Sequence, residues 1–128
     1  MTTQTRRDAV NWFEIPVRDI ARAQKFYEAL LGAPLRREEM GPNTLAVFTY
    51  DDTGVGGCLL AGPEAPAPAS SGTLVYLNVN PSLDAVLARL EAAGGRIIAP
   101  KVKLPGDMGS FVHIADSEGN RVGLHALA

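Results

Sequence analysis

Three side chains that could move a proton lie in otherwise apolar, strand-like stretches of this 128-residue sequence. Glu14 lies in VNWFEIPV, His113 in SFVHIA and His125 in RVGLHA. Carboxylates and imidazoles are common general acids and bases, and desolvation in an apolar site shifts their pKa values toward a useful range. The pattern therefore indicates Glu14, His113 and His125 as candidate catalytic residues.

Alternation along the strands predicts which side chains accompany these three. Successive side chains of a strand point to opposite faces, so Trp12 shares a face with Glu14, and Gly123 with His125. The same count along TLVYLNV places a further set on one face: Leu74, Tyr76 and Asn78. Apolar walls with a few polar groups are typical of small-molecule pockets.

Each of these residues also has a structural alternative. Glu14 is either a base or an edge-strand charge facing water, and Trp12 is either a stacking surface or core filler. The histidines are either functional or hydrogen-bonded structural residues, and Tyr76 either donates to a ligand or packs. Cys58 is the single cysteine, which rules out an internal disulfide and fits a small buried hydrophobe.

Composition excludes several classes of function. Apolar residues make up 46% and charged residues 20% of a chain with net charge −2, as expected for a globular domain without nucleic-acid or membrane partners. No apolar run approaches the roughly 18 to 20 residues needed to cross a bilayer. Residues 1–9 lack the apolar region of a secretory signal, so we expect a flexible leader and a cytoplasmic protein.

Helix signals occur twice, each after a strand-like stretch. Apolar residues recur at helical spacing from Ile20 to Leu31, with Asp19 as the N-cap and Gly32 as the C-cap. A second helix is expected after Pro81, ending at Gly94. Strands are expected at 10–17, 35–39, 45–50, 56–61, 73–79, 96–98, 110–115 and 121–126.

The two halves repeat one another. Val17 to Gly32 and Val79 to Gly94 are both 15 residues apart, and DDTG at 51–54 matches DSEG at 116–119. We therefore expect a single α+β domain over residues 10–126, built from a βαβββ module at 10–61, a Pro/Ala/Ser-rich linker at 62–72 and a second module at 73–126.

EIPVRDIARAQKFYEALLGAPL, LEAAGGRII and IADSEGNRVGLHA resemble the vicinal oxygen chelate superfamily, which includes glyoxalase I, extradiol dioxygenases and bleomycin-binding proteins. The resemblance covers about Val10 to Ala126. It implies a glyoxalase-like fold, in which two paired βαβββ modules form a curled mixed sheet around a cavity. It also implies a homodimer and a divalent metal in the cavity.

The resemblance assigns four metal-ligand positions to this chain. Five residues before Val17 and Val79 lie Trp12 and Leu74, and seven residues after Asp51 and Asp116 lie Cys58 and Gly123. Indole, isobutyl and hydrogen do not ligate such a metal, so we expect no metal and no other cofactor. A register shifted by two residues would instead offer Glu14 and His125 as ligands.

The expected pocket combines an apolar wall with polar points. By the family's spacing His113 faces the cavity, and Phe48 is its counterpart in the first half. Gly123 would leave room for a ligand. The wall then consists of Trp12, Phe48, Cys58, Leu74, Tyr76 and Gly123, and the polar points are Glu14, Asn78, His113 and His125.

These residues favour a metal-free protein that binds a small organic molecule. The alternatives are a metal-independent lyase or isomerase using Glu14, His113 or His125, a metal-dependent lyase or dioxygenase with the shifted ligands, and a purely structural dimerisation module.

Overall fold

The computed structural model describes residues 5–128, so the first four residues of the predicted leader lie outside the described part. Residues 5–9 are exposed and carry no helix or strand. Within the described residues, no helix is long and apolar enough to cross a membrane.

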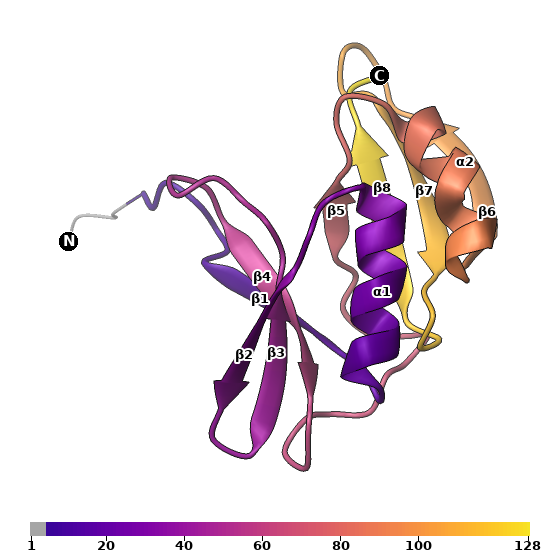
Figure 1. Cartoon of the computed structure of the whole chain (residues 1–128). Helices are drawn as coiled ribbons and strands as arrows, with labels where there is room; N and C mark the ends of the chain where they lie inside the picture. Colours follow the sequence, from indigo (N-terminus) through magenta and orange to yellow (C-terminus); the bar gives the residue numbers. More distant parts are fainter. Residues whose placement is uncertain (1–4) are drawn as a thin grey trace.

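Two four-stranded sheets and two helices make up the rest of the chain (Figure 1). Sheet A has the strand order β1-β4-β3-β2 and comprises β1 (Trp12–Pro16), β2 (Arg36–Met40), β3 (Asn43–Val47) and β4 (Gly56–Ala61). Sheet B has the order β5-β8-β7-β6 and comprises β5 (Tyr76–Asn78), β6 (Arg96–Lys103), β7 (Ser110–Ala115) and β8 (Arg121–Ala126). In each sheet one parallel pair, β1 with β4 or β5 with β8, adjoins antiparallel pairs. This is the predicted α+β, glyoxalase-like arrangement, with β1 and β5 as edge strands.

Helix α1 (Ile20–Leu31) has both predicted caps. The Asp19 side chain accepts a hydrogen bond from the Arg22 amide, and Gly32 ends the helix with a left-handed φ of 69°. α2 (Leu83–Ala93) begins at Ser82 and ends at Gly94 with φ 111°. The helices pack against each other, and α1 covers β3 and β4 while α2 contacts β8.

The core lies between the helices and one face of each sheet. Tyr27 and Leu30 of α1, Leu83 of α2 and Leu124 of β8 are completely buried there. We call the opposite face of each sheet its far face. On sheet A the far face carries a smaller buried cluster of Leu45, Val47, Cys58 and Leu60, against which Ala65 of the linker packs. The candidate residues other than Phe48 and Leu74 alternate onto the far faces.

The turn at 116–120 joins the two halves of the chain. Tyr27 of α1 donates a 2.7 Å hydrogen bond to the Asp116 carboxylate, and both residues are buried. Glu118 accepts hydrogen bonds from the Arg18 and Asp19 amides and pairs with Arg22 at 2.6 Å, although its side chain is fully buried. The second half thus caps the first helix.

Strands β1, β3, β5 and β6 differ in length from the sequence prediction, and β5 and β6 differ most. β5 is confined to Tyr76–Asn78, whereas a strand over 73–79 was expected. β6 continues to Lys103 because its residues after Ile97 still pair with β7, through two irregularities in register. Sheet pairing thus extends beyond the strand that was expected at 96–98.

Candidate ligand-binding site

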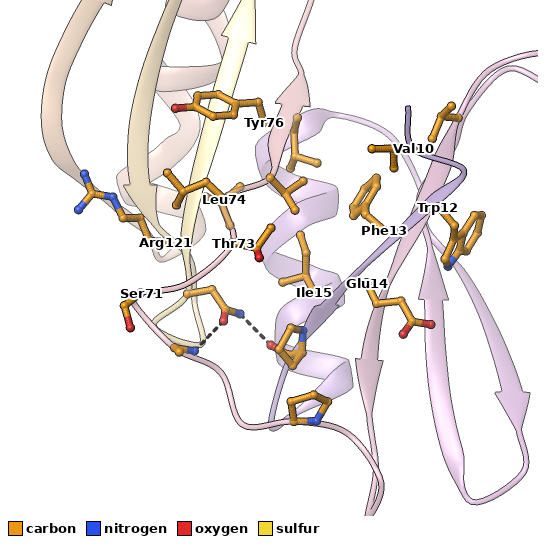
Figure 2. A pocket seen from close by; sticks show the side chains of 18 of the residues that line it. Val10, Trp12, Phe13, Glu14, Ile15, Ser71, Thr73, Leu74, Tyr76 and Arg121 are labelled. Atoms are coloured by element: carbon orange, nitrogen blue, oxygen red, sulfur yellow. Dashed lines mark hydrogen bonds between the residues drawn. The ribbon is translucent and has the colours of Figure 1, made fainter. Parts of the chain in front are cut away.

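A cleft of about 890 Å³ lies between the two edge strands, β1 and β5. Its further boundaries are linker residues 66–71 and the start of β8. Figure 2 shows Trp12 and Glu14 on the β1 side and Leu74, Tyr76 and Arg121 on the opposite side, with Phe13 and Ile15 between them. Matched positions of the two repeats, such as Trp12 and Leu74, which are 62 residues apart, therefore meet at one cleft.

Asn120 closes one end of the cleft. Its side-chain amide donates to the Pro16 carbonyl at the end of β1, 2.8 Å away, and its carbonyl accepts from the Ala69 amide at 3.0 Å (Figure 2). The same side chain also donates to Asp116 at 3.1 Å. Because β1 and the linker are both bound to one buried side chain, the spacing between the cleft walls is fixed at this end.

The β1 wall presents an aromatic pair and a carboxylate. Trp12 is 38% exposed and packs edge-on against Tyr50, with ring centroids 6.0 Å apart. The Tyr50 ring lies over Gly56, where any Cβ atom would collide with it. Glu14 is exposed and has no ion-pair or hydrogen-bond partner among the described residues. This wall offers a flat apolar surface beside a free carboxylate.

Cys58 lies next to Glu14 in the β1–β4 register but is completely buried. Burial, with a smaller contribution from the negative charge of Glu14, raises the pKa of its thiol to about 11. The thiol is therefore protonated at neutral pH, and a thiol is a poor nucleophile and metal ligand compared with a thiolate. Cys58 acts as a small apolar residue beneath the wall.

Phe48 does not lie where the sequence prediction placed it. Its ring packs against Tyr27 of α1 at 5.4 Å and against Phe13 at 5.6 Å, on the helix-covered face of sheet A. The residue that pairs with Cys58 is Val47, just as His113 pairs with Gly123 in sheet B. The first half has one more residue before its turn, and a shift of one residue reverses the face.

The β5 wall carries Leu74 and Tyr76, which are 38% and 47% exposed. The Tyr76 ring lies over Gly123, its neighbour in the β5–β8 register, and any Cβ atom there would collide with the ring. The prediction that Gly123 leaves room for a ligand is therefore wrong. The glycine makes room for Tyr76, as Gly56 does for Tyr50.

A chain of hydrogen bonds connects Tyr76 to β8. The Arg121 Nε–H donates to His113 Nδ1 at 2.9 Å, and His113 Nε2 lies 2.7 Å from the Tyr76 hydroxyl. Partial burial and the positive charge of Arg121 lower the pKa of His113. Its imidazole is thus neutral, with both ring nitrogens occupied. Arg121 was missed from the sequence, although it shares the face of Gly123 and His125 by simple alternation.

The remaining polar candidates are engaged elsewhere. His125 donates from Nε2 to the Met108 carbonyl at 2.7 Å, which anchors the loop between β6 and β7. Asn78 accepts a hydrogen bond from the Asn80 amide at 3.0 Å, although its side chain borders the cleft. Of the predicted site residues, the cleft is bordered by Trp12, Glu14, Leu74, Tyr76 and Asn78.

The family model of the Glyoxalase/Bleomycin resistance protein/Dioxygenase superfamily matches residues 9–124. The chain belongs to this superfamily. A putative glyoxylase, CFP32, of Mycobacterium tuberculosis is 27% identical over 124 residues. That match covers 95% of this chain and 47% of the relative, so the chain spans about half the length of the curated proteins it matches.

Solved structures of other proteins show the same fold. TnmS3, an antibiotic binding protein from Streptomyces, matches with a TM-score of 0.67 at 23% identity, covering 96% of this chain and 98% of that one. A domain from Frankia matches with a TM-score of 0.70 at 19% identity and similar coverage, 93% and 97%. Glyoxalase I from Zea mays matches over 91% of this chain and 45% of its own, with a TM-score of 0.65 at 22% identity.

The superfamily's metal does not fit the side chains at the four ligand positions. Trp12 and Leu74 border the cleft without a donor atom for a metal, Gly123 has no side chain, and Cys58 is a buried, protonated thiol. Within residues 5–128, no three His, Cys, Asp or Glu side chains gather closely enough to hold a metal ion. The shifted set fares no better, because Glu14 and His125 belong to no such group within residues 5–128 and His125 does not border the cleft.

Proposed function

We propose that this protein binds a small, largely apolar aromatic molecule in the cleft between β1 and β5, without a metal ion. The observation that carries the proposal is the exposure of Trp12, Leu74 and Tyr76 around one cleft whose width Asn120 fixes. Large exposed apolar side chains that line a concavity are typical of binding sites. The fold shared with TnmS3, described as an antibiotic binding protein, supports the same class of function.

The two aromatic walls suit a planar ligand. Trp12 packs against Tyr50, and Tyr76 packs against Phe111. Burying apolar surface contributes about 25 cal/mol per Å², and aromatic pairs add about 0.5–1.5 kcal/mol. A bicyclic or tricyclic aromatic molecule would therefore gain several contacts without reorganising the walls.

The test is thermal-shift screening of aromatic metabolites and polycyclic antibiotics, followed by calorimetric titration of the hits. We expect Trp12→Ala to weaken binding roughly 10-fold, because the flat β1 wall is lost. Met40→Ala is the matched control, since Met40 is also an exposed apolar strand residue of sheet A but does not border the cleft. Equal affinity of both variants would contradict the proposal.

We further propose that the protein works as a homodimer. β1 and β5 pair on one side only, and apolar side chains are exposed along both. Unpaired edge strands readily pair with another chain. Light scattering coupled to size exclusion tests this, and a monomer at micromolar concentration would contradict it.

Glu14 supports a second candidate, a metal-independent lyase or isomerase. Its carboxylate is exposed at the cleft and free of protein partners among residues 5–128, as a general base must be. Neither imidazole is comparably free, because His113 and His125 are hydrogen-bonded within the protein. In that case Glu14→Gln would abolish turnover of a bound ligand while leaving its affinity within about 3-fold.

Elemental analysis separates both candidates from a metal-dependent lyase or dioxygenase. We expect protein purified without chelator to contain far less than one equivalent of Zn, Ni, Mn or Fe. A stoichiometric metal that is lost in the variant Glu14→Gln would overturn the metal-free proposal.

A further inference from the structure

The hydrogen-bond chain on sheet B fixes where its protons lie. An arginine Nε–H is always a donor, so His113 Nδ1, 2.9 Å away, must be the unprotonated, accepting nitrogen. The neutral imidazole then carries its proton on Nε2, which donates to the Tyr76 oxygen at 2.7 Å. The tautomer of His113 thus follows from its contact with Arg121.

Tyr76 is left with a proton that no described residue receives. Its oxygen accepts from His113, so the phenolic O–H must point to another acceptor, and its only hydrogen bond among residues 5–128 is the one with His113. Tyr76 is 47% exposed and borders the cleft. Figure 2 shows the ring extending from β5 away from the β1 side, so its hydroxyl lies over the far face of sheet B, near His113 of β7. The free donor is therefore available to a ligand that extends from the cleft across β5 and β8 onto the far face of sheet B.

The ring that carries this donor is held on three sides. Gly123 lies beneath it, Phe111 packs edge-on with centroids 5.4 Å apart, and His113 lies 5.4 Å away. A donor that is already oriented loses little conformational entropy on binding. Partial burial and the charge of Arg121 lower the pKa of His113, so the neutral tautomer persists at physiological pH.

We propose that Tyr76 is the specificity-determining hydrogen-bond donor of the site, and that the ligand presents a carbonyl, carboxylate or phenolate oxygen to it. His113 and Arg121 are positioning residues that keep the phenol a donor. The inference rests on the proposed binding function and adds the chemical class of the ligand: an aromatic body carrying an oxygen acceptor at one end.

Three related probes test the donor: 2-naphthoate, the neutral 2-naphthamide and 2-ethylnaphthalene, which has no acceptor. Tyr76→Phe removes only the hydroxyl, and we expect it to weaken 2-naphthoate about 10-fold and 2-naphthamide about 5-fold, leaving 2-ethylnaphthalene unchanged. Met40→Ala is again the control, because Met40 is an exposed residue of sheet A that does not border the cleft. Equal loss for all three probes in Tyr76→Phe would overturn the proposal.

The positioning role of Arg121 can be tested without a ligand. Long-range ¹H–¹⁵N NMR of the wild-type protein should show the Nε2–H tautomer of His113, and Arg121→Met should give a mixture of tautomers. Arg121→Met should weaken both 2-naphthoate and 2-naphthamide about 3-fold. An Nδ1–H tautomer of His113 in the wild type would contradict the positioning role. A loss of affinity in Arg121→Met for 2-naphthoate alone would also contradict it, because that result indicates a direct ion pair between the ligand and Arg121.

The two proposals fail in different ways. If the probes bind, Trp12→Ala weakens them and Tyr76→Phe does not, the cleft is a binding site and the donor assignment is wrong. If none of the probes and no screened aromatic molecule binds, the proposed function fails, and the ligand class fails with it.

Discussion

The turns at 51–54 and 116–119 have nearly the same sequence but different roles. Asp51 accepts hydrogen bonds from the amide and hydroxyl of Thr53, and this turn is exposed. Asp116 is buried, and its carboxylate accepts hydrogen bonds from the Glu118 and Asn120 backbone amides. It also accepts a hydrogen bond from the Tyr27 hydroxyl, in the other half of the chain. One turn closes only on itself, whereas the other connects the two halves.

Two substitutions between the repeats account for this difference. Thr53 stands where the second turn has Glu118, and Val55 stands where it has Asn120. Glu118 reaches the first turn of α1, and Asn120 reaches the end of β1. A duplicated framework thus became asymmetric through side chains long enough to reach the other half.

The largest predicted effect breaks the buried turn. Asp116→Ala leaves the Tyr27 hydroxyl and two amides without their acceptor, and we expect a loss of about 3–5 kcal/mol in unfolding free energy. Asp51→Ala should cost less than about 1 kcal/mol because water replaces its partners. Urea denaturation measures both, and comparable losses would show that the two turns carry equal weight.

A smaller effect concerns the charge of Glu118. Hydrogen bonds from Arg22, followed by those from nearby amides, lower its pKa from the ordinary 4.5 to about 2. Because the folded pKa is depressed, this stabilisation is complete above about pH 4.5 and is lost as the pH falls toward 2.

Glu118→Gln should therefore cost about 2 kcal/mol at pH 7 and flatten the dependence of stability on pH below 4.5. Arg22 is half exposed, so part of the interaction is screened by solvent. Thr53→Ala is the counterpart in the other turn, and its stability should follow the wild-type pH profile. If Glu118→Gln keeps the wild-type dependence of stability on pH below 4.5, groups other than Glu118 cause the loss of stability in acid.

The smallest effect compares the two glycines beneath tyrosine rings. Gly123→Ala and Gly56→Ala each force a ring aside, and we expect each to cost about 1 kcal/mol in stability. Gly123→Ala should weaken 2-naphthamide more than Gly56→Ala does, because it moves the donor on Tyr76, whereas Gly56→Ala moves Tyr50, which packs against Trp12. Equal loss of affinity in both variants would mean that ring packing, rather than the hydroxyl, sets recognition.

Local signals in the sequence were sufficient for much of the fold. The capped helix from Ile20 to Leu31 and the strands β4, β7 and β8 have the predicted bounds, because apolar periodicity and cap residues act within a few positions. The cleft residues on β1 and β5 followed from alternation. The division at 62–72 stays a prediction, although sheet A precedes it and sheet B follows it.

The sequence predictions that failed were those that depended on contacts between strands. Phe48 was placed by counting back from a turn, and one additional residue in the first half reversed its face. Gly123 was interpreted as empty space because the position of the Tyr76 ring is not visible in a linear pattern. The Arg121–His113–Tyr76 chain spans three strands, so only the tertiary structure brings these side chains together.

Asn120 gives the cleft a blind end. Because its side chain bonds the end of β1 to the linker, a bound ligand cannot extend past Asn120. Any bulky substituent of the ligand must therefore leave the cleft at another side. An affinity resin or fluorescent reporter for this protein should therefore carry its tether on the side of the probe remote from Asn120.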